Sequence, residues 1–149
     1  MVKPSKFKVS LCLHHPKMNP DVISSGLSLN PQFMYMVGDR RKTPKGNLLE
    51  GFNEDSYWTC EMRPSRKEGL ADCLRASLSK LERKASFLRK FSATGGHLEF
   101  FIGWFVNSNC GEVLDFDLLR RLADLRIELS FDVYPLTASR GYKKTRRGK

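Results

Sequence analysis

The chain has 149 residues, of which 40% are hydrophobic and 11% aromatic, and it carries a formal net charge of +10. This size fits one domain with a buried core, and no segment reaches the roughly 20 consecutive apolar residues of a membrane-spanning helix. The first residues lack the apolar core of a signal peptide, so the sequence predicts a cytoplasmic protein without membrane association.

The N-terminal segment is expected to form a strand followed by a short helix. Residues 7–15 alternate between apolar and polar side chains, which is the pattern of a strand with one buried face. Asn19 is suited to cap a helix that has Pro20 at its first position, and the Asn30-Pro31 pair is expected to end it.

A basic loop is expected between two further strands. Residues 33–37 fit a brief strand, and the stretch that follows, up to residue 56, is basic and punctuated by glycine and proline. We therefore expect a mobile loop there. Residues 57–62 predict the next main strand, which Pro64 ends because proline cannot donate to a ladder.

A long amphipathic helix is the clearest element in the middle of the chain. Its apolar residues recur at steps of three and four and form one stripe: Leu70, Leu74, Leu78, Leu81, Ala85 and Leu88. Ser65 and Glu68 have the spacing of a capping box at its start, and Gly95-Gly96 is expected to terminate it.

The C-terminal half predicts two more strands around a helix. Residues 98–106 are apolar on both faces, which is typical of a strand in the middle of a covered sheet. Asp115 is suited to cap the next helix, and residues 127–134 alternate as a final strand. The helix residues expected to face inward are Phe116, Leu118, Leu119, Leu122 and Leu125.

This order predicts an α+β fold of the ferredoxin-like, or split βαβ, type: an antiparallel sheet with the long amphipathic helix inserted between strands two and three. Residues 1–134 are expected to form the single domain, and residues 135–149 a disordered basic tail. The second face of the strand at residues 98–106 is covered either by the long helix or by another chain in a sheet-to-sheet homodimer.

Several segments together resemble a bacterial family known as domain of unknown function 4279. They are Asn19-Pro20-Asp21-Val22-Ile23, Gly38-Asp39 with Gly46 before Trp58, the leucine-rich helix, and the run from Leu118 to Tyr134. The resemblance covers most of residues 7–134, with the closing helix and strand as its most specific part. It implies the fold and a bacterial origin, and it assigns no catalytic residue.

The residues that bear chemistry form no recognisable catalytic or cofactor motif, so we expect a protein that is not an enzyme and has no cofactor. His14, His15 and His97 are expected at the surface. A metal site of His14 with Glu128 and Asp132 is weaker than the alternative that either acid pairs with Lys8 across neighbouring strands. The scattered thiols Cys12, Cys60, Cys73 and Cys110 predict reduced, mostly buried cysteines without zinc or disulfides.

Binding remains as the expected function, because positive charge gathers in three places. A protein-binding module, with an immunity or inhibitor protein for an acidic-surfaced partner as the concrete version, is expected to use Arg40, Arg41, Lys42, Lys45, Arg75, Arg83 and Lys90. The alternative is non-specific nucleic-acid binding through the basic loop, the helix face and the tail residues Arg140, Lys143, Lys144, Arg146 and Arg147.

Overall fold

The computed structural model describes residues 6–65 and 68–136. Its elements, in chain order, are β1 (Lys6–His15), α1 (Pro20–Leu27), β2 (Phe33–Tyr35), β3 (Arg40–Lys42), β4 (Leu48–Phe52), β5 (Ser56–Met62), α2 (Leu70–Glu82), α3 (Ala85–Ala93), β6 (His97–Val106), α4 (Phe116–Asp124) and β7 (Ile127–Pro135). The predicted tail lies outside the described residues except for its first two positions. Within the described part of the chain, no helix is long and apolar enough to cross a membrane.

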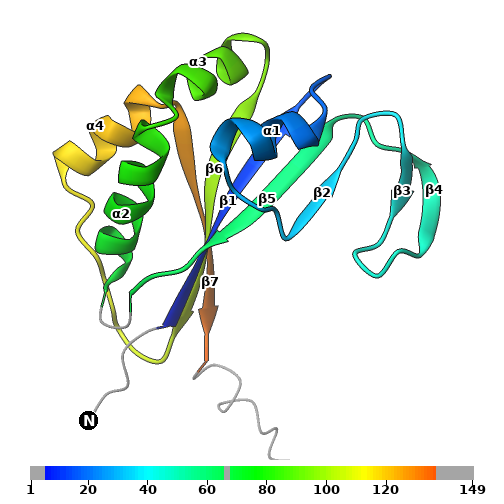
Figure 1. Ribbon diagram of the computed structural model, residues 1–149. Helices are drawn as coiled ribbons and strands as arrows, with labels where there is room; N and C mark the ends of the chain where they lie inside the picture. Colours follow the sequence, from blue (N-terminus) through cyan, green and yellow to red (C-terminus); the bar gives the residue numbers. More distant parts are fainter. Residues whose placement is uncertain (1–5, 66–67, 137–149) are drawn as a thin grey trace, which may run out of the picture.

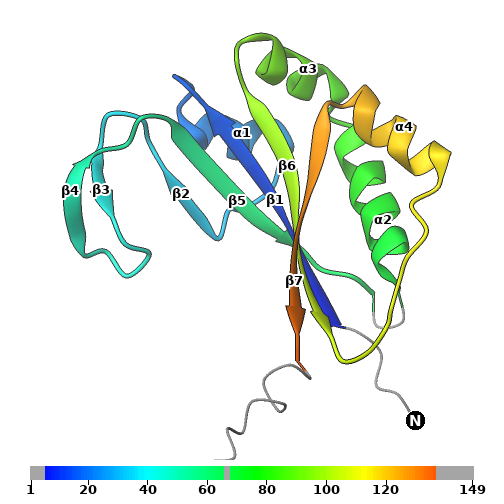
Figure 2. The same ribbon diagram turned by 180° about the vertical axis from the view of Figure 1, so that it is seen from behind.

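The main sheet has five strands in the order β2-β5-β1-β6-β7 (Figure 1). β1 is antiparallel to both β5 and β6, whereas β7 runs parallel to β6. β3 and β4 form a separate antiparallel hairpin that projects from one end of the molecule (Figures 1 and 2). The protein is thus α+β, with a mixed sheet.

The ferredoxin-like strand order is wrong for this chain. That order makes the first and last main strands neighbours, but here β5 and β6 occupy both sides of β1. β7 therefore lies at the sheet edge beside β6. The connection from the end of β6 through α4 returns the chain to the level where β6 begins, and β7 therefore runs parallel to β6.

A split βαβ unit is nevertheless present at the other end of the sheet. β5 is antiparallel both to β1 and to β2, so β2 is parallel to β1 with β5 between them. The second parallel strand of this unit is the brief segment Phe33–Tyr35, which the sequence marks only weakly.

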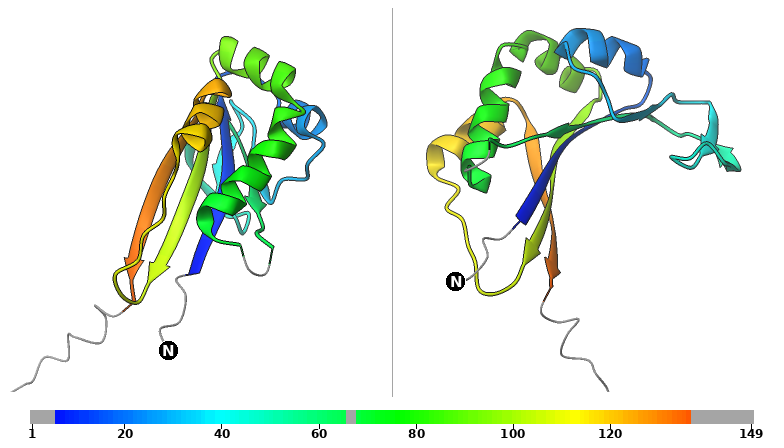
Figure 3. Two further views of the ribbon diagram at one scale, coloured as in Figure 1. Left: turned by 90° about the vertical axis from the view of Figure 1, so that its left-hand side faces the viewer. Right: turned by 60° about the horizontal axis from the view of Figure 1, so that its bottom comes forward.

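The helices bury one face of the sheet. Val9, Leu11 and Leu13 of β1 are fully buried there, and the core continues through Trp58 of β5 and Phe100 of β6. Figure 3 shows α1, α2 and α3 gathered on this side. The long-helix segment therefore does not cover the second face of β6, and the described residues leave that face open.

The predicted long helix is two helices, α2 and α3, with a bend at Arg83 and Lys84. The apolar stripe continues across the bend, because Leu81 and Leu88 are both buried. The bend carries α3 towards α1, where Gly26 leaves room for the Phe87 ring: a Cβ at Gly26 would overlap it. Close packing of α1 against α3 thus accounts for the change of direction.

Side chains cap the N-termini of α1, α2 and α4, two of them from the residue just before the helix and one from a distant segment. Asn19 accepts from the Asp21 N–H, and Asp115 accepts from the Leu118 N–H at 2.9 Å, so both predicted caps are confirmed. α2 starts at Leu70, later than the Ser65–Glu68 box, and its Ala71 N–H donates to Glu112 Oε1 at 3.0 Å.

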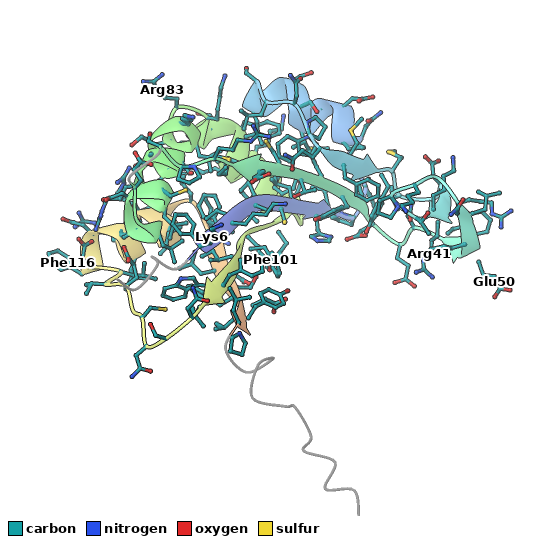
Figure 4. The ribbon with its side chains drawn as sticks, turned by 90° about the horizontal axis from the view of Figure 1, so that it is seen from below. Lys6, Arg41, Glu50, Arg83, Phe101 and Phe116 are labelled. Atoms are coloured by element: carbon teal, nitrogen blue, oxygen red, sulfur yellow. The ribbon has the colours of Figure 1, made fainter. Side chains whose placement is uncertain are left out.

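The inward face of α4 is narrower than predicted. Leu118, Leu122 and Leu125 are buried, whereas Phe116 is 78% exposed and Leu119 is 48% exposed. Phe116 lies in the first turn, beyond the edge of the sheet, and points away from the body in Figure 4. The predicted five-residue face thus reduces to the three leucines that reach the core.

His15 is buried and not on the surface as predicted. Its Nδ1 accepts from the backbone N–H groups of Lys17 and Met18 at 3.0 and 2.8 Å, and its Nε2 lies 2.9 Å from Thr94 Oγ1. An Nδ1 that accepts carries no proton, so this geometry requires the neutral ring. Burial accordingly lowers the pKa of His15 from its ordinary value of 6.5.

Stability is expected to fall as the pH drops below 6.5, the ordinary pKa of His15. In that range the unfolded chain takes up a proton on this ring and the folded protein does not, so the free energy of unfolding decreases. His15→Asn keeps an acceptor near Nδ1. We expect it to lower stability at neutral pH by about 1 kcal/mol, through loss of the Thr94 contact, and to flatten the pH dependence.

Urea unfolding between about pH 7.5 and about pH 5.5, above the range where carboxylates titrate, measures this effect. The matched control is His97→Asn, because His97 is half exposed and pairs with Glu128 at the surface. Equal pH slopes for the two variants would show that His15 does not carry the effect.

Candidate binding surfaces

The first candidate surface is the basic hairpin, residues 40–52. Its cations Arg40, Arg41 and Lys42 form β3, and every residue of β3 and β4 is exposed. Arg40 Nη2 donates to the Leu49 carbonyl at 3.3 Å and Arg41 Nη1 to the Glu50 carbonyl at 3.4 Å, which fixes these side chains along β4.

The hairpin replaces the predicted mobile loop. Its turn is closed by backbone hydrogen bonds of 2.8 Å from Thr43 N to Asn47 O and from Gly46 N to Thr43 O. Gly46 has φ of 89° and Gly51 of 86°, values that favour glycine. Because no face of such short strands is buried, they lack the apolar alternation by which a strand is recognised in sequence.

A hollow of about 450 Å³ lies at the base of the hairpin. Its lining combines Phe33 and Tyr35 of β2 with Arg40, Arg41 and Lys42 of β3. Next to it the hairpin exposes apolar side chains, with Leu48 59% and Phe52 65% accessible. Apolar surface, aromatic rings and positive charge thus meet on one projecting element.

The second candidate surface is the open sheet face, the side of the main sheet turned away from the helices. The strand register places its residues side by side: Phe33 and Tyr35 of β2, Tyr57, Thr59 and Glu61 of β5, Lys6, Lys8, Ser10, Cys12 and His14 of β1, His97, Glu99, Phe101 and Phe105 of β6, and Glu128, Ser130, Asp132 and Tyr134 of β7. Figure 4 shows Phe101 on this side, away from the helices.

A His–Asp pair lies at one end of the open sheet face. His14 Nδ1 is 2.7 Å from Asp55 Oδ2, and the Tyr35 hydroxyl donates to Asp55 Oδ1 at 3.4 Å. The Tyr57 ring packs on His14 with centroids 4.7 Å apart, and its hydroxyl donates to Cys12 Sγ at 3.5 Å. Burial raises the pKa of Tyr57 to about 12, so this hydroxyl stays protonated near neutral pH.

The structure does not bring together His14, Glu128 and Asp132, the residues of the metal site that the sequence analysis set aside. Glu128 and Asp132 lie on β7, and β6 separates that strand from His14 on β1. Glu128 pairs with His97 at 3.4 Å. Among residues 6–65 and 68–136, no group of three or more histidine, cysteine or acidic side chains is placed to hold a metal ion.

The predicted salt pair of Lys8 with Glu128 or Asp132 is also wrong. Lys8 Nζ is 3.9 Å from Glu61 Oε2 instead, because the neighbours of β1 are β5 and β6. Only the tertiary arrangement could identify Glu61, His14 and Asp55 as residues of one face.

The predicted partner-binding cations do not form one surface. Arg75 is held between Asp72 and Asp115, with both Nη–Oδ distances at 2.9 Å. Arg83 and Lys90 are exposed on the helical side, and Figure 4 shows Arg83 at the opposite end of the molecule from Arg41. Arg40, Arg41, Lys42 and Lys45 alone stay together, while Arg140, Lys143, Lys144, Arg146 and Arg147 lie outside the described residues.

The four cysteines are free thiols in different environments. Cys12 and Cys73 are buried, Cys60 is half-buried, and Cys110 is exposed. Burial raises the pKa of the Cys60 and Cys73 thiols, which lowers the fraction of reactive thiolate.

We expect one fast-reacting thiol per folded chain, that of Cys110, because it alone is fully accessible. Titration with a coloured aromatic disulfide at about pH 8 measures this, since thiolate is the attacking species. Cys110→Ser should abolish the fast phase, and the other three thiols should react only after denaturant is added. A fast phase that persists in Cys110→Ser would contradict this expectation and would point first to Cys60, the half-buried thiol.

Together these features define a small α+β domain with helices on one sheet face, an open second face and a projecting basic hairpin. A family model described as domain of unknown function (DUF4279) matches residues 5–136, and the chain belongs to this family. The predicted family is therefore confirmed. No curated protein and no solved structure matches the chain.

Proposed function

We propose that the protein is a non-enzymatic binding module that docks an acidic-surfaced partner protein through the basic hairpin, as an immunity or inhibitor protein would. The observation that carries the proposal is the coincidence on this hairpin of three consecutive cations with exposed Leu48 and Phe52. Large exposed apolar side chains beside charge are typical of interaction sites.

The position of the hairpin supports this function. It makes its own two-stranded sheet and stands clear of the helix-covered core, so a partner can approach it from several sides (Figure 2). Arg40, Arg41 and Lys42 line the hollow with a single acid, Asp39, and the charge there is therefore positive. Such a surface attracts an acidic partner over a distance of about one Debye length.

A cytoplasmic location is part of the same proposal. All four cysteines are unbridged, and reduced thiols are the rule in the cytoplasm.

A photo-crosslinking phenylalanine analogue in place of Phe52 is expected to capture a discrete acidic protein in cells of the native host. The matched control carries the analogue in place of Phe116, which is also exposed but lies on α4. Identical products from the two positions would contradict docking at the hairpin.

Reversal of Arg40, Arg41 and Lys42 to Glu should abolish that crosslink and slow association with the captured protein about tenfold at low salt, because attraction becomes repulsion. Reversal of the exposed Arg83, Arg89 and Lys90 changes the net charge equally and should leave the association rate within about twofold. Equal slowing by both reversals would assign the effect to net charge alone.

Single-stranded nucleic acid is the second candidate partner, because Phe33 and Tyr35 share the hairpin hollow with the three cations. Aromatic rings beside basic side chains are the usual means of binding single strands. The rings of Phe33 and Tyr35 are half-buried, however, and the Tyr35 ring already packs against the Tyr57 ring with centroids 5.4 Å apart. This contact leaves little ring surface on which a base could stack.

Fluorescence anisotropy with a labelled single-stranded RNA separates the two candidates. We expect deletion of residues 137–149 to abolish most RNA binding, since this segment contributes six cations to sequence-independent attraction. Binding that survives the deletion and is lost in Tyr35→Leu would instead favour nucleic acid as the partner of the hairpin.

A further inference from the structure

The open sheet face is hollowed along the length of β1. One hollow, of about 420 Å³, extends from His14 to Lys8, and a second, of about 210 Å³, extends from Lys8 to Tyr134. The two share Lys8, Ser10 and Phe101 and therefore form one trough. From His14 to Lys8, the six residue steps along the strand span about 20 Å, so an extended peptide of about seven residues matches this length.

Aromatic rings line both ends of this trough. Phe33 and Tyr57 lie with centroids 6.2 Å apart at one end. Phe105 and Tyr134 stack with centroids 5.0 Å apart at the other. Phe101 lies between them and lines both hollows. The faces of aromatic rings attract cations such as the ammonium of lysine and the guanidinium of arginine.

The charge of this face is opposite to that of the whole chain. It carries five carboxylates, Asp55, Glu61, Glu99, Glu128 and Asp132, against the lysines Lys6 and Lys8. Lys8 pairs with Glu61, and the two histidines His14 and His97 pair with Asp55 and Glu128. A protein of net charge +10 thus presents an acidic sheet face.

Of the five carboxylates on this face, Glu99 is the one without a partner among the described residues. It is half-buried, lines the larger hollow, and makes no hydrogen bond or ion pair with any residue that the structure describes. A carboxylate that has lost part of its hydration gains most from a cationic hydrogen-bond donor. The same carboxylates repel phosphate groups, so this face disfavours nucleic acid.

We infer that the open sheet face is a second binding surface and that its occupant is an extended, lysine- or arginine-rich segment of a partner protein. A cationic side chain of the segment pairs with Glu99 and lies against Phe101. The hydroxyl groups of Ser10 and Thr59 line the same hollow and would receive polar groups of the peptide backbone. This surface shares Phe33 with the hollow at the base of the hairpin, but the residues that its test changes, Glu99 and Phe101, do not line that hollow.

The test uses the full chain, labelled with ¹⁵N, and an eight-residue peptide of alternating lysine and serine as the probe. We expect amide shifts confined to the strands that line the trough, namely β1, β2, β5, β6 and the Tyr134 end of β7. Glu99→Gln should weaken the peptide's affinity about five- to tenfold, because it removes one charge-assisted hydrogen bond. Glu50→Gln, at the far end of the hairpin in Figure 4, removes the same charge and should leave the affinity unchanged.

Phe101→Leu is the second variant and should weaken binding about threefold through loss of the cation–π contact. A peptide of alternating glutamate and serine should not bind. Equal affinity of Glu99→Gln and Glu50→Gln, or shifts that map to the hairpin, would overturn the site. If spermine bound as tightly as the peptide, the occupant of this face would be a small polycation and not a protein segment. If a single-stranded oligonucleotide shifted the same amides, the occupant would be nucleic acid.

Discussion

Burial of one sheet face by the helices is the constraint on which the rest of the structure depends. Val9, Leu11 and Leu13 project from β1 into the helix layer and are inaccessible to solvent, and each alternate residue of that strand must then face the other way. The open sheet face is the direct consequence. Its aromatic and acidic side chains lie on the surface because the helices that the structure describes pack on the opposite side of the sheet.

Caps and ion pairs fix the position of α4 relative to α2 in the helix layer. Asp115 caps α4 and also pairs with Arg75 of α2, while Arg121 of α4 bonds to Glu82 at the end of α2. These contacts fix α2 against α4 at both ends, so that Arg75 serves structure more than partner binding. Among the predicted partner-binding cations that the structure describes, Arg40, Arg41, Lys42 and Lys45 are the ones that lie together, on the hairpin.

The two surfaces proposed for binding differ in sign and in construction. The basic hairpin stands on two short, exposed strands and combines cations with Leu48 and Phe52. The open sheet face rests on the rigid central strands and combines Glu99 with aromatic rings. Opposite charges on separate elements favour two different ligands over one, and a module of this kind is suited to joining an acidic partner with a basic segment.

The sequence by itself determined which segments are helical, though not the break between α2 and α3, and it determined the four main strands, the caps at Asn19 and Asp115, and the family. Each of these depends on local periodicity or on side chains close in the sequence. It also placed Arg40, Arg41 and Lys42 together, since they are adjacent in the chain. Only the tertiary structure decided which strands are neighbours, that the chain bends between α2 and α3 so that α3 packs on Gly26 of α1, and that His14, Asp55 and Glu99 share one face. Strand order follows from long-range packing, in which β5 and β6 take both sides of β1, and no local pattern in the chain records that competition.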